Sequence, residues 1–208
     1  MTVVDLDTPH GPARAHLHLA DEPAGALVLG HGAGGGVGAP DLAAATQAAR
    51  SLGLSVALVE QPYRVAGRRS PAPARQLDAA WTAVVEGLRA GALGGMPLVA
   101  GGRSSGARVA CRTAEATGAA GVLCLAFPLH PPRRSPDAPP KTRLPELEAV
   151  AVPTLVVQGE RDPFGMPPAG AGREVVTVRG DHRLAADLDA VAAAVRDWLP
   201  RVVGPDRR

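Results

Sequence analysis

Short apolar runs alternate along the chain with longer segments of helical periodicity. The runs are almost continuous in Val, Leu and Ala, which is typical of strands buried on both faces of a parallel sheet. One segment, 14–19, instead alternates polar and apolar residues, which predicts an antiparallel edge strand. The buried strands are expected at residues 25–30, 55–60, 97–101, 121–127, 154–158 and 174–178.

Between these runs, apolar residues recur at the three- and four-residue spacing of amphipathic helices. The helices are expected at residues 41–52, 76–90, 105–117 and 184–199. Pro200 should end the last helix, leaving 201–208 as a frayed tail. Alternating strands and helices predict an α/β fold, with a mostly parallel sheet and helices on both of its faces. The Pro/Arg-rich segment 128–145 is long for a connection, and long loops are often functional.

The length of 208 residues favours one domain, 1–208, with a core that needs no disulfide or metal. Its composition, 46% hydrophobic and 20% charged, is that of a globular protein. Aromatic residues make up only 2%, so we expect no nucleic-acid partner. No apolar run reaches the 18 residues of a membrane span, and the first residues include acids where a signal peptide has bases. We therefore expect a cytoplasmic protein that does not bind membranes. Cys111 and Cys124 lack CxxC spacing and should be buried, reduced thiols.

A G-x-S-x-G sequence, Gly102-Arg103-Ser104-Ser105-Gly106, lies where a predicted strand meets a predicted helix. This is the context of a nucleophile elbow, a tight turn that holds a serine in a strained conformation. The residues two before and two after the nucleophile must be small. Gly102 and Gly106 meet that need for Ser104, whereas Ser105 would place Arg103 at a crowded position. Ser104 is therefore the candidate nucleophile.

A second glycine-rich segment, 30–36 (GHGAGGG), follows the first buried strand. Acyl transfer needs two N–H donors for the oxyanion of its tetrahedral intermediate. One should come from Ser105, directly after the nucleophile, and the other from this loop, at Ala33. We expect His31 to shape the loop without acting as a base, and His31 and Gly32 to line the site.

The same glycines allow another interpretation. Gly30, Gly32 and Gly35 also spell G-x-G-x-x-G, and Glu60 ends the next strand, which is the outline of a dinucleotide fingerprint. Against it, the loop continues to Pro40, whereas the fingerprint enters its helix at once. This alternative also leaves the G-x-S-x-G sequence unexplained.

Two further residues complete a candidate triad. A serine nucleophile needs a histidine base and a carboxylate that orients it. Asp162 follows the strand at 154–158, with Glu160 as the runner-up, and His182 follows the strand at 174–178. Asp181 is expected to be a turn residue. No cofactor is expected. No metal is expected either, because His16 and His18 share a strand face but lack an evident third ligand.

Arginines gather in the loops after the predicted strands, where sites of parallel sheets lie. Guanidinium groups suit carboxylates and phosphates, so these loops favour a basic rim that selects anionic acyl substrates. Arg68, Arg69 and Arg103 are the candidate substrate contacts, with His130 beside them in FPLHPP. The loops also carry Arg64, Arg133, Arg134, Arg161 and Arg183. The competing interpretation is that these are solvated arginines of an Arg-rich chain.

The sequences HGAGG, GGRSSG, GERDPFG and GDHRL, with PYRVAGRR and FPLHPP, resemble a small α/β-hydrolase-like family. This family includes a testis-expressed hydrolase-like protein and a subunit of the NSL histone-acetylation complex, and dienelactone hydrolases are more distantly similar. The resemblance implies an α/β-hydrolase fold without a helical cap and the triad Ser104, Asp162 and His182. Dienelactone hydrolases use a cysteine nucleophile, so Ser104 argues against a dienelactone substrate.

The function expected from the sequence is that of a cofactor-free serine hydrolase of an ester or thioester. The alternative is a binding or scaffold protein on the same fold with an idle triad, because fold does not decide function.

Overall fold

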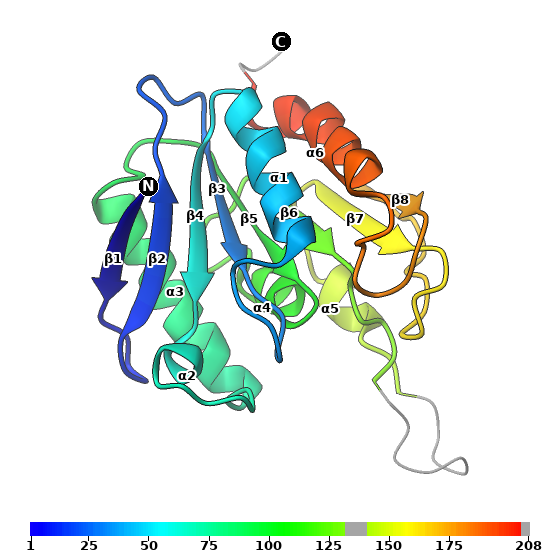
Figure 1. Ribbon diagram of the computed structural model, residues 1–208, viewed down its shortest axis with the longest axis horizontal. Helices are drawn as coiled ribbons and strands as arrows, with labels where there is room; N and C mark the ends of the chain where they lie inside the picture. Colours follow the sequence, from blue (N-terminus) through cyan, green and yellow to red (C-terminus); the bar gives the residue numbers. More distant parts are fainter. Residues whose placement is uncertain (132–140, 205–208) are drawn as a thin grey trace.

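The computed structural model describes residues 1–131 and 141–204, which form an eight-stranded sheet covered by helices (Figure 1). The strand order is β1-β2-β4-β3-β5-β6-β7-β8. The strands are β1 Thr2–Leu6, β2 Ala13–His18, β3 Ala26–Gly30, β4 Ser55–Glu60, β5 Leu98–Arg103, β6 Gly121–Leu125, β7 Thr154–Gly159 and β8 Arg173–Val178.

Strands β3 to β8 are mutually parallel, and β1 and β2 pair antiparallel at one edge. The predicted mostly parallel sheet and the antiparallel strand near residues 14–19 are confirmed. The outermost strand, β1, was not predicted. Its sequence TVVDL is short, and only one of its faces is covered by the rest of the protein.

The helices cover both faces of the sheet, as predicted. In Figure 1, α1 and α6 lie in front of the sheet, and α3 and α4 lie behind it. Two apolar cores separate accordingly, one containing Trp198 of α6 and the other containing Trp81 of α3. The helices are α1 Pro40–Ser51, α2 Pro62–Val65, α3 Ala74–Ala90, α4 Ser105–Thr113, α5 Leu144–Glu148 and α6 Leu188–Val203. None of the helices in the described ranges is long and apolar enough to cross a membrane.

The last helix corrects two predictions. It continues through Pro200 to Val203, so Pro200 does not end it and residues 201–203 are not frayed. A proline removes one helical hydrogen bond. Burial of Leu199 and Val203 in the core on this face offsets that loss. The remaining tail, 205–208, lies outside the described residues.

The loops that follow β4 and β6 each contain one short helix, α2 before α3 and α5 before β7. Within the described residues, no helical domain is inserted there. Part of the Pro/Arg-rich segment, residues 132–140, lies outside the description. Both cysteines are buried as expected, and their Sγ atoms lie 3.5 Å apart in a thiol–thiol hydrogen bond without a disulfide.

The parallel strands place the candidate residues at one edge of the sheet. Ser104 directly follows β5, Asp162 follows β7, and His182 follows β8. The glycine-rich loop follows β3, the neighbour of β5. Since the carboxyl ends of parallel strands meet at the same edge, these four loops converge there.

Candidate active site

Ser104 occupies a sharp turn between β5 and α4. Its backbone has φ 53° and ψ −106°, a conformation that non-glycine residues rarely adopt. The turn is held because the Ser104 N–H donates to the carbonyl of Leu125 on β6, at 2.9 Å. The strained serine expected of a nucleophile elbow is therefore present, with its side chain half-buried at the start of a helix.

Glycines flank this turn because the backbone of β3 passes very close to it. A Cβ on Gly102 would lie 2.5 Å from the Gly30 carbonyl oxygen, and a Cβ on Gly106 would also collide with that oxygen. Any larger residue would push the elbow away from β3. This contact is the physical reason for the G-x-S-x-G spacing.

A chain of two hydrogen bonds joins the three candidate residues. The Ser104 hydroxyl lies 2.9 Å from His182 Nε2, and His182 Nδ1 lies 2.8 Å from Asp162 Oδ2. The donor directions that fit are Ser104 to Nε2, and Nδ1–H to the carboxylate. The imidazole is partly exposed, whereas the Asp162 carboxylate is buried. The runner-up Glu160 is exposed and instead pairs with Arg161.

The Asp162 carboxylate has two further donors. Oδ1 accepts from the Phe164 N–H, and Oδ2 accepts from the Gln158 side-chain amide, each at 2.8 Å. The Phe164 ring also packs edge-on against the His182 ring, with centroids 4.5 Å apart. Gln158 is fully buried at the end of β7 and was not singled out from the sequence. Its only sequence signal is a polar residue within an apolar strand.

The loop that carries Asp162 packs directly on the loop that carries His182, which we call the base loop. The N–H of Arg161 donates to the Gly180 carbonyl at 2.9 Å. A Cβ on Gly159 would collide with the Asp181 carbonyl oxygen, so the last residue of β7 must be glycine for the base loop to approach. Asp181 accepts from the Arg183 N–H, which is the turn role expected for it.

The glycine-rich loop is fixed by His31 and Tyr63. His31 is buried and bonds the Gly32 carbonyl through Nδ1 at 2.8 Å, while its Nε2 accepts from the Gln61 N–H at 3.2 Å. The ring is therefore a neutral tautomer, and burial lowers the pKa of His31 further. This arrangement fits a residue that shapes the loop. The Tyr63 hydroxyl donates to the Ala33 carbonyl, a contact that the sequence did not reveal.

Of the two predicted oxyanion donors, Ala33 lies in the glycine-rich loop and Ser105 directly follows Ser104. Ser105 is the first residue of α4, where an N–H has no partner within its own helix. Among the described residues, neither its N–H nor that of Ala33 donates to a protein acceptor. Within the described ranges, neither group has a competing protein acceptor.

Arg103 does not belong to a basic rim. Its Nε forms an ion pair with Asp41 of α1 at 2.9 Å, and its Nη2 donates to the His182 carbonyl at 3.1 Å. The predicted role as a substrate contact is corrected for this residue, because a buried acid and a backbone carbonyl already occupy its guanidinium. Asp41 was not singled out from the sequence, since nothing local links it to Arg103.

The other candidate contacts are only partly placed at the site. Arg161 pairs with Glu160, whereas Arg68, Arg69 and Arg183 are exposed. His130 bonds the Lys141 carbonyl and packs against Gly165, which is a structural role in its loop. Arg133 and Arg134 lie outside the described residues.

The dinucleotide interpretation does not fit the loop. Helix α1 begins at Pro40, five residues beyond Gly35, so no helix N-terminus follows the glycines directly. Glu60, the acid of that fingerprint, bonds His16 on β2 at 3.0 Å. Among residues 1–131 and 141–204, no group of three or more potential ligands is arranged to hold a metal ion.

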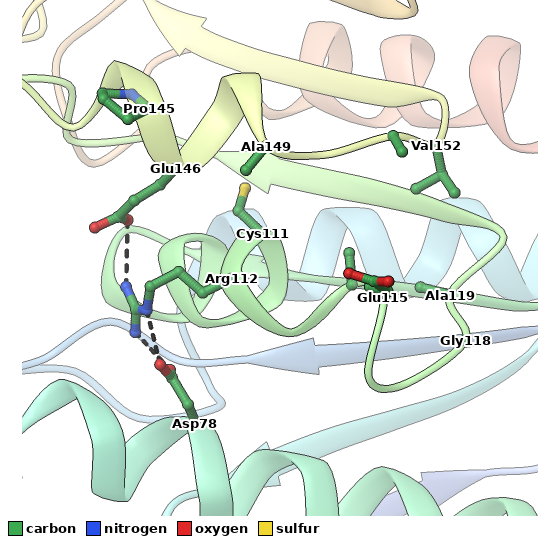
Figure 2. A pocket seen from close by; sticks show the side chains of 12 residues that line it. Asp78, Cys111, Arg112, Glu115, Gly118, Ala119, Pro145, Glu146, Ala149 and Val152 are labelled. Carbon is green, nitrogen blue, oxygen red and sulfur yellow. Dashed lines mark hydrogen bonds and ion pairs between the residues drawn. The ribbon is translucent and has the colours of Figure 1, made fainter.

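A separate hollow of about 940 Å³ lies on the helical face behind the sheet (Figure 2). Arg112 of α4 lines it and bonds Asp78 of α3 and Glu146 of α5. None of the three triad candidates lines this hollow. The ion pairs in this hollow can therefore be compared with the ion pair that Arg103 forms next to Ser104.

Residues 23–186 match the protein family described as "Alpha/beta hydrolase domain". The chain belongs to this alpha/beta hydrolase family. No curated protein matches it.

Solved structures show the same alpha/beta hydrolase fold at low sequence identity. An α/β serine hydrolase without a lid from Xanthomonas campestris is 22% identical with a TM-score of 0.69, over 96% of this chain and 95% of that one. Est1E from Butyrivibrio proteoclasticus is 14% identical with a TM-score of 0.77, over 98% and 99%. A dienelactone hydrolase from Anabaena variabilis is 15% identical with a TM-score of 0.74, over 97% of each chain. The fold expected from the sequence is thereby confirmed.

Proposed function

We propose that this alpha/beta hydrolase is a cofactor-free serine hydrolase that cleaves a carboxylic ester or thioester through an acyl-enzyme. The observation that carries the proposal is the hydrogen-bonded chain from Ser104 through His182 to Asp162, with spacings of 2.9 and 2.8 Å. Three loops, each following a different strand, contribute one residue each. A structural hydrogen-bond network would not need a serine held at φ 53°.

In the first half-reaction, Ser104 Oγ attacks the substrate carbonyl carbon while its proton moves to His182 Nε2. Asp162 stabilises the imidazolium that forms. The carbonyl oxygen becomes an oxyanion, which the N–H groups of Ala33 and Ser105 bind. The intermediate then collapses, the bond to the leaving group breaks, and His182 returns the proton to the departing alkoxide or thiolate.

In the second half-reaction, water replaces the leaving group. His182 takes a proton from the water as its oxygen attacks the acyl carbon. The bond between that carbon and Ser104 breaks, the serine recovers its proton, and the acid is released. No electron transfer and no further reactant are needed.

The names of the structural neighbours support a hydrolase, since they include serine hydrolases and an esterase domain. Ser104 departs from the cysteine of dienelactone hydrolases, so we propose an ester or thioester of another class. Membership of the testis-expressed or NSL branch stays a prediction.

A panel of p-nitrophenyl esters and acyl thioesters tests the proposal. Ser104→Ala and His182→Ala should each remove nearly all turnover, and the double variant should be scarcely slower, because the groups act as a unit. Asp162→Asn should cost less than either. Additive losses would contradict these roles, and no turnover of any substrate would favour the scaffold alternative.

A further inference from the structure

Arg103, the last residue of β5, contacts three parts of the site with one guanidinium group. Its Nε pairs with Asp41 near the start of α1, and its Nη2 bonds the His182 backbone carbonyl. Its Nη1 lies under the glycine-rich loop, 2.8 Å from where a Cβ on Gly32 would be. Helix α1, the loop that carries His182 and the glycine-rich loop therefore meet at a single side chain adjacent to Ser104.

The Asp41 partner of this guanidinium is completely buried. Its carboxylate has no exposed surface, and burial raises the pKa of Asp41 although Arg103 opposes that shift. Removing two charges from water costs about as much as their attraction returns, so a buried pair is a weak source of stability. The pair matters for geometry instead, because Asp41 holds the guanidinium at Nε.

His182 is held from two sides. Asp162 and Ser104 contact the imidazole, and Arg103 contacts the backbone carbonyl of the same residue. Releasing the carbonyl would let the base loop shift and would lengthen the hydrogen bonds of the imidazole to Ser104 and Asp162. Displacements near 1 Å in a catalytic group cost about 100-fold in rate.

We propose that Arg103, anchored by Asp41, is a positioning residue that holds the His182 backbone so that its imidazole faces Ser104. This inference rests on the proposed function. It differs from a basic rim, since the guanidinium acts on the base and not on the substrate.

The planar guanidinium is needed for this double contact. Arginine reaches Asp41 through Nε and His182 through Nη2 at once, whereas the single ammonium of lysine cannot span both. Arg103→Lys therefore keeps the positive charge beside Asp41 and removes the hydrogen bond to the His182 carbonyl. Asp41→Asn keeps the guanidinium and loses its anchor.

The chain offers a matched control on the neighbouring helix. Arg112 is also ion-paired and has a similar exposed fraction, 19% against 17% for Arg103. It bridges Asp78 and Glu146 in the hollow of Figure 2, away from the triad candidates. Arg112→Lys and Asp78→Asn thus report the general cost of disturbing a half-buried pair in this protein.

The experiment measures the rate of fluorophosphonate labelling, and kcat and KM for an ester turned over by the wild type. Arg103→Lys and Asp41→Asn should each lower the labelling rate and kcat about 10- to 100-fold with KM unchanged, and the double variant should be no slower than the worse single one. Arg112→Lys and Asp78→Asn should keep the wild-type rates. Wild-type rates in Arg103→Lys, or equal losses in the Arg112 control, would overturn the proposal.

A second measurement does not depend on turnover. The Nδ1 proton of His182, bonded to Asp162, should give a downfield proton NMR signal that disappears in His182→Gln. We expect Arg103→Lys to broaden or remove it and Arg112→Lys to keep it. An unreactive wild type with this pattern would refute the proposed function and retain the positioning role, whereas an unchanged signal in Arg103→Lys would overturn the positioning role itself.

Discussion

The Tyr63 hydroxyl donates a hydrogen bond to the carbonyl oxygen of Ala33, at 3.0 Å. It joins the segment after β4 to the loop after β3. The Ala33 N–H, our candidate oxyanion donor, belongs to the loop that this bond steadies.

Replacing this tyrosine should weaken catalysis without weakening binding. Tyr63→Phe removes one neutral hydrogen bond, worth about 1 kcal/mol, and we expect kcat to fall about fivefold with KM unchanged. Steady-state kinetics with a neutral p-nitrophenyl ester measure both constants. An unchanged kcat would show that the loop does not need this contact.

Gln158 should be needed to hold the acid of the triad. Gln158→Leu removes one of the two donors to Asp162 Oδ2, and it also leaves the buried Phe127 and Gly165 carbonyls without the amide. We expect a loss of about 1–3 kcal/mol in the free energy of unfolding, together with a lower kcat. Denaturant unfolding and ester kinetics measure the two effects. Full activity in a folded Gln158→Leu protein would argue against this role.

Acid should destabilise the protein partly through His31. Burial lowers the pKa of His31 below its ordinary 6.5, so the unfolded chain binds more protons than the folded one between the two values. Its contribution to stability is complete above pH 6.5 and is lost as the pH falls through the folded pKa. In His31→Gln, unfolding free energies should start lower at pH 8 and fall less between pH 7 and 5. Parallel pH profiles for the two proteins would contradict this account.

With Arg103 excluded, the hypothesis that the enzyme prefers anionic substrates rests on the exposed arginines after β4, Arg68 and Arg69. Arg68→Ala and Arg69→Ala should each raise KM for an ester with a distal carboxylate by up to about fivefold, and salt should reduce the effect. KM for a neutral ester should not change. Arg50→Ala, at the far end of α1, serves as the control. Equal effects on both esters would remove the arginines from substrate selection.

Much of the fold follows from local sequence. The buried strands are contiguous apolar runs, and the turn at Ser104 has a sequence that only a close backbone approach to Gly30 explains. The prediction that Pro200 ends the last helix was wrong, because the burial of Val203 is a tertiary effect that outweighs the local helix-breaking signal of proline. The expected start of that helix was also early, since residues 184–187 belong to the base loop and α6 begins at Leu188.

The supporting residues of the site could not be read from the chain. Asp41 and Arg103 are 62 residues apart, and Tyr63 is 30 residues from Ala33, so only the sheet brings these pairs together. Gln158 looked like the polar end of a strand. The structure brings Ser104, Asp162 and His182 together, and their catalytic roles stay predictions that rest on this geometry.

The most direct test of those roles is the site of covalent modification by a fluorophosphonate probe, located by peptide mass spectrometry. We expect one adduct per chain, on Ser104, that is absent from Ser104→Ala and that forms much more slowly in His182→Ala. No adduct on the folded wild-type protein, or an adduct on Ser105 in place of Ser104, would contradict these roles.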